Sequence, residues 1–344
     1  MEPRVTNLYK RIPVLDGWRG VAIILVLITH YQSAVLRHYM FGKRFLDVGQ
    51  HGVTIFFVLS GYLITSKLLT EESFSLQRFY VRRFFRLMPA AWAYLATLLL
   101  LTVFTRFKVV GDDLGSCLLF FRNYVVETTR NTCTEHFWSL SLEEQFYLIW
   151  PLLLTALGRK RSVAAAVLGV TSIAVFRIAH WNSFNVPYRM LYSQVRADAL
   201  IVGCLLAFAL EKENVRRWFR NVGPTLFPAC LVLFMLDAYY FQELIPLHEA
   251  VDIAVMIGIT TVNQASVFTR SLQWEHLQTT GIYSYSIYVW QGLLLRYNWG
   301  IFGFFALPVV VALSWAFIEK PGIAYGRKVT RRETSPFSLE PARV

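Results

Sequence analysis

Long apolar runs are the feature that most limits what this 344-residue chain can fold into. A helix needs about 20 residues to cross a bilayer, and about 17 at the short end. Backbone groups inside a bilayer have to be hydrogen-bonded within their own segment, so runs of this length predict transmembrane helices. Ten such runs cover residues 17–37, 48–69, 87–105, 137–157, 163–180, 196–211, 222–241, 250–268, 278–296 and 301–319.

The composition supports the same fold class. Only 16% of the residues are charged and 55% are hydrophobic, whereas a soluble domain has about 25% charged residues. The net charge of +12 does not indicate a nucleic-acid partner, because the Lys and Arg residues form short clusters between the apolar runs, as they do in cytoplasmic loops. We therefore predict an all-α, multi-pass helix bundle in the cell (inner) membrane, surrounded by membrane lipid.

The basic clusters predict how the chain is oriented. Residues 114–126 form an apolar run that is too short to span and contains an arginine. If this run stays outside, the GRKR cluster at 158–161 and the RRWFR cluster at 216–220 lie on the same side as both termini. The positive-inside rule favours that arrangement, so both termini are predicted to be cytoplasmic. Residues 1–321 are then the membrane domain, and residues 322–344 are predicted to be a short, basic, disordered tail.

The first run, with the sequence LDGWRGVAIILVLITHY, carries polar residues that are costly inside a bilayer. Asp16 and Arg19 lie three residues apart and are predicted to pair at the inner membrane surface. Arg19 and His30 are eleven residues apart, so both leave the same helix face, separated by about 16 Å along the axis. This makes His30 a candidate catalytic base near mid-membrane.

Two glutamates stand inside the fourth run, in the segment HFWSLSLEEQFYLIWP. Glu143 shares a helix face with Ser139, while Glu144 points about 100° away. If the helix enters from the outer side, Glu143 lies at a depth similar to that of His30, and the two are predicted to meet. A carboxylate on one imidazole nitrogen fixes the tautomer and stabilises the imidazolium, which is how a general base is assembled.

An arginine cluster lies at the cytoplasmic start of the third run, in FYVRRFFRLMPAAW. Its members are Arg78, Arg82, Arg83 and Arg86. Spacings of three and four residues place several of these guanidinium groups on one helix face. Guanidinium groups recognise phosphates through paired hydrogen bonds, so the cluster is a candidate phosphate site.

Structural roles are the alternatives for each of these sets. His30 can be a core histidine satisfied by one hydrogen bond. The two glutamates of the fourth run can pair with Arg177 or Arg196 and only hold helices together. The arginine cluster can anchor a helix end beside anionic lipid headgroups.

Seven segments, in order, resemble the signature segments of acyltransferase family 3, a family of integral-membrane proteins. They are LDGWRGVAIILVLITH, GVTIFFVLSGYLIT, FYVRRFFRLMPA, FWSLSLEEQFYLIWP, VRADALIVGCLLA, GIYSYSIYVWQ and FIEKP, and they extend from about residue 12 to residue 321. The resemblance implies O-acylation, usually acetylation, of sugars on bacterial glycans, lipopolysaccharide, exported oligosaccharides or macrolide-type metabolites.

The resemblance also implies which residues act. The arginine and histidine of the family's first span match Arg19 and His30. Its RxxR motif matches Arg83 and Arg86, and the first glutamate of its SxEEQFY-like segment matches Glu143.

Two positions depart from the family pattern. Thr54 stands where an aspartate is common, and Gln291 stands where a histidine is common. Glutamine cannot act as a base at pH 7, so no catalytic role is carried over to Gln291. Some relatives carry a fused extracytoplasmic esterase-like domain, which is not evident here, so we expect the chain to finish the transfer alone or with a separate partner.

Residue pattern and resemblance lead to one expected mechanism. Acetyl-CoA is the expected co-substrate, and no metal or permanently bound cofactor is expected. Its phosphates are predicted to bind Arg82, Arg83 and Arg86. His30 then removes the proton of a carbohydrate or lipid-linked glycan hydroxyl as that hydroxyl attacks the thioester carbonyl. Glu143 orients His30 or binds the sugar.

The remaining candidates have less specific roles. Arg19 is expected to hold part of the donor or to stabilise the oxyanion. Weaker candidates for contact with the substrate are Ser139, Trp138, Arg196 and Asp198.

Two other functions use the same polar residues. A proton-coupled transporter or flippase would also place His, Glu and Arg inside the membrane, although we find no internal repeat of the kind common in transporters. A scaffold of a glycan-export complex would use them to hold helices together. In the predicted outer loop, Cys117 and Cys133 are candidates for a disulfide, with the unpaired state favoured.

Overall fold

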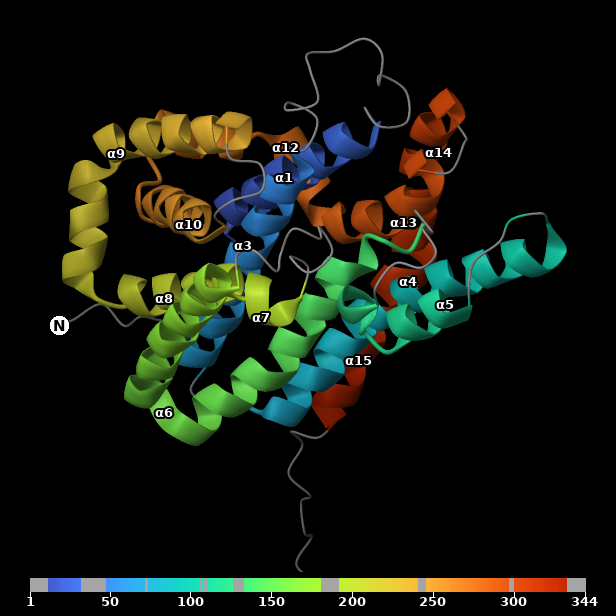
Figure 1. Ribbon diagram of the computed structural model, residues 1–344, viewed down its shortest axis with the longest axis horizontal. Coiled ribbons are helices and arrows are strands. Elements are labelled where there is room, and N and C mark those ends of the chain that lie inside the picture. Colours follow the sequence, from blue (N-terminus) through green and yellow to red (C-terminus); the bar gives the residue numbers. More distant parts are fainter. Residues whose placement is uncertain are drawn as a thin grey trace, which may run out of the picture.

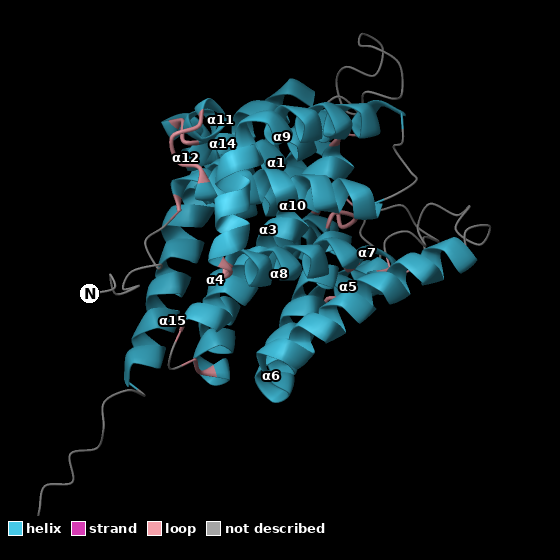
Figure 2. Cartoon of the chain, turned by 90° about the vertical axis from the view of Figure 1, so that its left-hand side faces the viewer, coloured by secondary structure: helices cyan, strands magenta, loops and turns pink. Residues whose placement is uncertain are grey.

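The computed structural model describes residues 12–31, 48–71, 74–105, 107, 111–125, 133–180, 192–240, 246–296 and 300–332. Within these residues all regular elements are helices, which confirms the predicted all-α class (Figure 2). They are α1 (Pro13–Tyr31), α3 (Gly49–Thr70), α4 (Leu76–Phe104), α5 (Gly111–Leu118), the 3-10 helix η2 (Arg122–Tyr124), α6 (Phe137–Ala179), α7 (Ser193–Arg196), α8 (Asp198–Leu210), α9 (Glu213–Tyr240), α10 (Pro246–Val262), α11 (Val267–Leu272), α12 (Glu275–Ile282), α13 (Ser284–Arg296), α14 (Gly300–Ser314), the π-helical turn η5 (Trp315–Glu319) and α15 (Lys320–Arg332).

Six helical segments of the described chain are long and apolar enough to cross a membrane. They are Pro13–Tyr31, Gly49–Thr70, Leu76–Phe104, Phe137–Ala179, Glu213–Tyr239 and Phe302–Arg331. This supports a multi-pass membrane protein. The predicted number of ten is not reached by length, because α6 covers two predicted runs, α8 and α13 have 13 residues each, and α10 has 17. Ten spans and cytoplasmic termini therefore stay predictions.

Helix α6 has two arms, which separate at Gly158. This glycine has φ 70° and ψ 173°, a conformation that side chains with a Cβ rarely adopt. Figure 1 shows the two arms of α6 rising from a bend at the lower edge of the molecule. The bend lies between the predicted runs 137–157 and 163–180, so each run corresponds to one arm.

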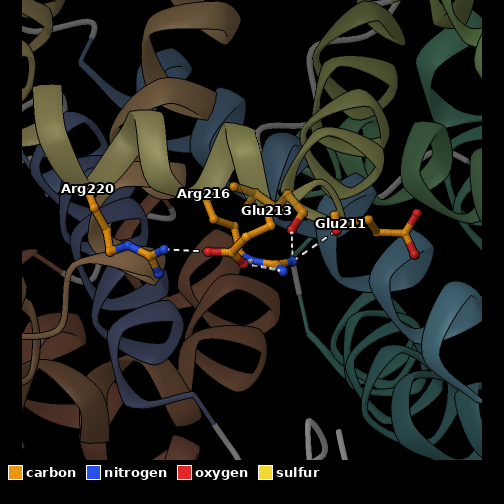
Figure 3. A network of polar contacts seen from close by, with 5 residues as sticks. Glu211, Glu213, Arg216 and Arg220 are labelled. Carbon is orange, nitrogen blue, oxygen red and sulfur yellow. Dashed lines mark hydrogen bonds and ion pairs between the residues drawn. The ribbon is translucent and has the colours of Figure 1, made fainter. Parts of the chain in front are cut away.

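The bend of α6 is joined to the junction of α8 and α9 by charged side chains. Arg159, next to the bend, forms an ion pair with Glu211. Figure 3 shows the adjoining network, in which Glu213 accepts hydrogen bonds from Arg216, at 2.6 and 2.8 Å, and from Arg220. Two basic clusters of the sequence therefore lie near each other, as the predicted orientation requires.

Helices α1 and α3 are antiparallel neighbours at the centre of the molecule. The backbone N–H of Gly49 donates to Thr29 Oγ1 at 2.7 Å, so α3 begins beside the end of α1. Trp18 Nε1 donates to Thr260 Oγ1 at 3.0 Å and ties α1 to α10. The contact between Gly49 and Thr29 sets the level of the α1 residues relative to α3.

The predicted disorder after residue 321 is wrong for residues 322–332, because these residues belong to α15. Helix α15 runs beside α4 in both views (Figures 1 and 2). Tyr325 packs edge-on against Phe85 with ring centroids 4.9 Å apart. Composition alone suggested a charged tail, but residues at helical spacing form one face that packs on α4. Residues 333–344 lie outside the described residues.

Candidate active site

Five helices, α1, α3, α4, α6 and α13, enclose a cavity of about 260 Å³. Most of its lining residues are spaced three or four apart on their helix, which is the spacing of one helix face. On α3 the face includes Val53, Phe56, Ser60, Ile64 and Lys67. From Val53 to Lys67 this face extends about 21 Å along the helix axis.

The cavity wall carries an excess of positive charge. Its charged lining residues are Arg19, Lys67, Arg82, Arg83, Arg86, Glu143 and Glu144. Two carboxylates cannot neutralise five cations, so the cavity is suited to an anionic ligand. The structure thus brings together all three predicted phosphate-binding arginines and two of the three predicted catalytic residues.

Arg83 is held by both glutamates of α6. Its Nη2 lies 2.6 Å from Glu144 Oε1 and 3.9 Å from Glu143 Oε1. Its guanidinium also covers the Tyr147 ring, 3.0 Å from the ring centroid. Ser60 on α3 donates a hydrogen bond to Glu143. The Arg83 charge is therefore neutralised inside the protein, and this network joins three helices.

The other arginines of the cavity differ in the hydrogen bonds and ion pairs that they form with neighbouring side chains. Arg19 lies 3.2 Å from Asp16, which confirms the predicted pair. Arg82 Nε donates to Thr330 Oγ1 at 2.9 Å. Arg86 is exposed to the cavity and makes no hydrogen bond or ion pair with any residue that the structure describes. Among the arginines, Arg86 is the most available to an anion.

Lys67 is a cavity residue that the sequence analysis missed. It lies on the α3 wall, with Nζ 5.6 Å from the centroid of the Phe79 ring of α4. A signal was present in the sequence, because Lys67 is seven residues from Ser60 and therefore shares its face. Lys67 lies near the end of the predicted run 48–69, and its charge was not considered as part of a site.

The predicted contact between His30 and Glu143 is not formed. Ser60 lies 11 residues along α3 from Gly49, which contacts Thr29. This spacing is about 16 Å of helix. Glu143 accepts from Ser60 and so lies at the middle of α3, whereas His30 lies level with its beginning. The prediction was wrong because it calculated the depths of His30 and Glu143 for helices that start at the membrane surfaces and run perpendicular to them.

His30 lies just beyond one end of the cavity. Val53, which lines that end, is four residues from Gly49. This is about 6 Å along α3. Because Gly49 contacts Thr29, the residue before His30, the cavity runs from Lys67 at one end toward His30 at the other.

The neighbouring candidates Ser139 and Trp138 have different surroundings. Ser139 lines the cavity, and its Oγ lies 2.5 Å from Tyr288 Oη on α13. Trp138 is buried and packs edge-on against Phe57, with ring centroids 6.0 Å apart. Trp138 is not a lining residue of the described cavity.

Arg196 and Asp198 are buried in a second polar cluster, apart from the described cavity. Asp198 Oδ2 lies 2.7 Å from Arg177 Nη2 on α6. Arg196 Nη2 donates to Thr54 Oγ1 on α3 at 3.4 Å. The cluster joins α3, α6, α7 and α8. The alternative in which these two arginines pair with the glutamates of α6 is wrong, because those glutamates bind Arg83.

The two cysteines of the predicted outer loop, Cys117 and Cys133, are not joined by a disulfide in the described structure. Cys117 Sγ lies 3.9 Å from the Thr134 carbonyl oxygen. Burial raises the pKa of the Cys117 thiol from its ordinary value of 9.0 to about 12. The thiol therefore stays protonated at neutral pH.

The model of the acyltransferase domain family matches residues 12–318 of this chain. The chain belongs to this acyltransferase family. The match covers the helices that enclose the cavity, and it confirms the resemblance carried by the seven sequence segments. No solved structure matches the chain.

Curated relatives with similar sequences are longer proteins. The peptidoglycan O-acetyltransferase OatA of Listeria monocytogenes is 28% identical, over 91% of this chain and 56% of its own length. The putative peptidoglycan O-acetyltransferase YrhL of Bacillus subtilis is 29% identical, over 95% and 57%. The O-acetyltransferase OatA of Staphylococcus aureus is 25% identical, over 92% and 58%. This chain therefore spans a little more than half the length of these relatives.

Proposed function

We propose that this protein is a membrane O-acetyltransferase that moves an acetyl group from acetyl-CoA to a hydroxyl of a carbohydrate or lipid-linked glycan. The observation that carries the proposal is the cavity, which has an excess of positive charge and whose α3 wall ends at Val53, about one helical turn from the Gly49–Thr29 contact beside His30. The acyltransferase family supports the reaction type. The names of the relatives support the acetyl group and a glycan acceptor.

The phosphates of the donor bind to the cations that face the cavity from α3 and α4. Arg86 faces the cavity from α4 and Lys67 from α3. Lys67, Arg82 and Arg86 line the same cavity, so a phosphate group bound among them reduces the repulsion between their like charges. Guanidinium and ammonium groups both bind phosphate. Arg83 has a supporting role, because Glu144 and Glu143 already neutralise it.

The acetyl end of the donor extends along the cavity toward His30. Val53 and Phe56 provide an apolar wall for the pantetheine arm. His30 takes the proton of the acceptor hydroxyl while its oxygen attacks the thioester carbonyl carbon. The carbon–sulfur bond then breaks, coenzyme A leaves as the thiol after taking that proton from His30, and the acceptor carries the new ester. Arg19, also on α1, binds the donor between these two ends.

The test compares membranes that contain equal amounts of folded wild type, His30→Ala and His248→Ala. His248 pairs with Asp237 away from the cavity and is the matched control. Radiolabelled acetyl-CoA and de-O-acetylated peptidoglycan are supplied, and label is followed into an alkali-labile ester. We expect label with wild type and control, and a loss of about 100-fold or more in His30→Ala.

Two outcomes would contradict the proposal. Equal label with His30→Ala would remove His30 from the chemistry and direct attention to Glu143. Label absent even from the wild type would contradict acetyl transfer to this acceptor. The transporter alternative would then be tested by measuring glycan flux across proteoliposomes.

A further inference from the structure

Gln291 on α13 is a completely buried amide whose polar atoms are not satisfied. Its side chain is 0% exposed. Neither Nε2 nor Oε1 has a hydrogen-bond partner in the described part of the chain. Leaving a buried donor and acceptor unpaired is destabilising, and native structures contain few such groups. Packing therefore gives no reason for an amide here, because an apolar side chain of similar shape would avoid this loss.

The position of Gln291 relates it to the cavity. Ser284 and Tyr288 of α13 line the cavity, and Gln291 follows them by seven and three residues. All three therefore share one helix face. Gln291 lies about 4.5 Å beyond Tyr288 along the helix.

Gln291 lies at the same end of the cavity as His30. Tyr288 contacts Ser139 and packs edge-on against Phe56, with ring centroids 6.3 Å apart. These residues line the cavity away from Lys67, at the opposite end from the phosphate site. Helix α13 also packs against α1, which carries His30. Gln291 thus continues the cavity wall toward the proposed base.

We propose that Gln291 binds the acceptor at the His30 end of the cavity, an inference that rests on the proposed function. A carbohydrate hydroxyl both donates and accepts a hydrogen bond, so the amide can hold one or two neighbouring hydroxyl groups through Nε2–H and Oε1. The amide is neutral and does not compete with His30 for the proton. Because Gln291 is closed off from the cavity, the acceptor displaces wall side chains, of which Tyr288 is the nearest along α13.

The proposal predicts that replacing Gln291 by an apolar residue makes the protein more stable and weakens its binding of the acceptor. Gln291→Met keeps the size of the side chain and removes both unpaired atoms. We expect its melting temperature in detergent to rise by about 2 °C. The KM for a soluble peptidoglycan glycan fragment should rise about tenfold, because the hydrogen bonds to the acceptor are lost. The Kd for acetyl-CoA should not change.

Gln145→Met is the matched control. The Gln145 amide is hydrogen-bonded to the Phe120 carbonyl at 2.7 Å, to Asn123 at 3.0 Å and to Ser193 at 2.6 Å. The same substitution there breaks existing hydrogen bonds and should lower the melting temperature. Opposite changes in melting temperature would show that the Gln291 amide lacks hydrogen-bond partners whereas the Gln145 amide has them.

Each other result overturns the proposal. A higher melting temperature of Gln291→Met with an unchanged acceptor KM would show that the amide is not used. A lower melting temperature would show that the amide is already hydrogen-bonded in the free protein.

A separate measurement keeps this proposal distinct from the proposed function. The glycan fragment should raise the melting temperature of the wild type by binding, and this shift should be lost in Gln291→Met. Equal shifts in both proteins would overturn the role of Gln291. If the wild type transfers no acetyl group, the proposed function fails, while this binding measurement still tests Gln291.

Discussion

At the residue scale, neighbouring arginines of α4 have different roles although the sequence presents them as one cluster. Arg83 lies 2.6 Å from Glu144, and Arg82 donates to Thr330 of α15. Arg86 faces the cavity without a partner among the described residues. A charge in such a place is stabilised when a ligand supplies the opposite charge. Lys67 faces the same space from α3, so these two residues form the centre of the proposed phosphate site.

Replacing Lys67 by Met tests the phosphate site. We expect the Kd for acetyl-CoA to rise about tenfold, because a charge-assisted contact with phosphate is lost. The affinity for acetyl-pantetheine, which lacks phosphate, should stay the same. The matched control is Lys212→Met, an exposed lysine outside the cavity. The measurement is equilibrium binding to purified protein in nanodiscs.

The same measurement separates the donor from lipid as the partner of Lys67. If the loss of affinity occurs only in nanodiscs that contain anionic lipid, Lys67 binds a lipid headgroup instead. Equal affinities of Lys67→Met and wild type for acetyl-CoA would remove Lys67 from the donor site.

Cys117 provides a test of pH dependence. Its pKa is raised by burial to about 12, so almost none of it is the reactive thiolate at pH 8. We expect a maleimide to label Cys117 at pH 8 only after unfolding, as followed by mass spectrometry. Because the folded pKa is raised, the stabilising contribution of the protonated thiol is complete below pH 9 and is lost between pH 9 and about 12. Rapid labelling of the native protein at pH 8 would contradict this burial.

At the element scale, close helix contacts hold the walls of the cavity in place. A Cβ atom at Gly61 of α3 would overlap the carbonyl oxygen of Leu200 in α8, and one at Gly203 would overlap that of Val58. Small residues allow this close approach of two helix backbones. Because Ser60 is next to Gly61, the approach of α8 also determines where the α3 wall of the cavity lies.

Gly61→Ala is therefore expected to destabilise the protein by about 1–3 kcal/mol, since the two helices have to separate. The control is Gly115→Ala in α5, where an added Cβ meets nothing within 4 Å. Melting temperatures of both purified variants provide the comparison. An unchanged value for Gly61→Ala would show that α3 and α8 can separate at little cost.

At the scale of the whole molecule, the charged clusters predict the orientation in the membrane. The bend of α6 and the junction of α8 and α9 are joined by Arg159 and Glu211, so both lie on one side. The positive-inside rule predicts that this side, with the C-terminal helix α15, faces the cytoplasm. Apolar side chains exposed along α4, α6 and α14 are then in contact with lipid.

Cysteine labelling in intact cells tests this orientation. Lys160→Cys and Lys328→Cys are exposed positions in α6 and α15, and the native cysteines are buried. A membrane-impermeant maleimide should label neither variant until the membrane is permeabilised. Leu119→Cys, at a side chain that is 68% exposed in the predicted outer loop, should be labelled at once. Labelling of Lys160→Cys in intact cells would reverse the orientation.

The sequence by itself determined the helical class, because backbone groups in a bilayer have to be paired within each segment. It also determined contacts within single helices, such as the pair of Asp16 and Arg19. The common cavity face of the α4 arginines was predictable for the same reason, since the helix period decides which side chains share a face. The order of the seven segments was enough to predict the family.

Only the tertiary structure decided which helix faces meet and at what level. It paired the α6 glutamates with Arg83, placed Glu143 about 16 Å along α3 from the level of His30, and added Lys67 to the cavity. The physical reason is that sequence periodicity fixes directions around one helix axis. Tilt and register between helices depend on side-chain packing across the whole bundle, including the contacts at Gly61 and Gly203.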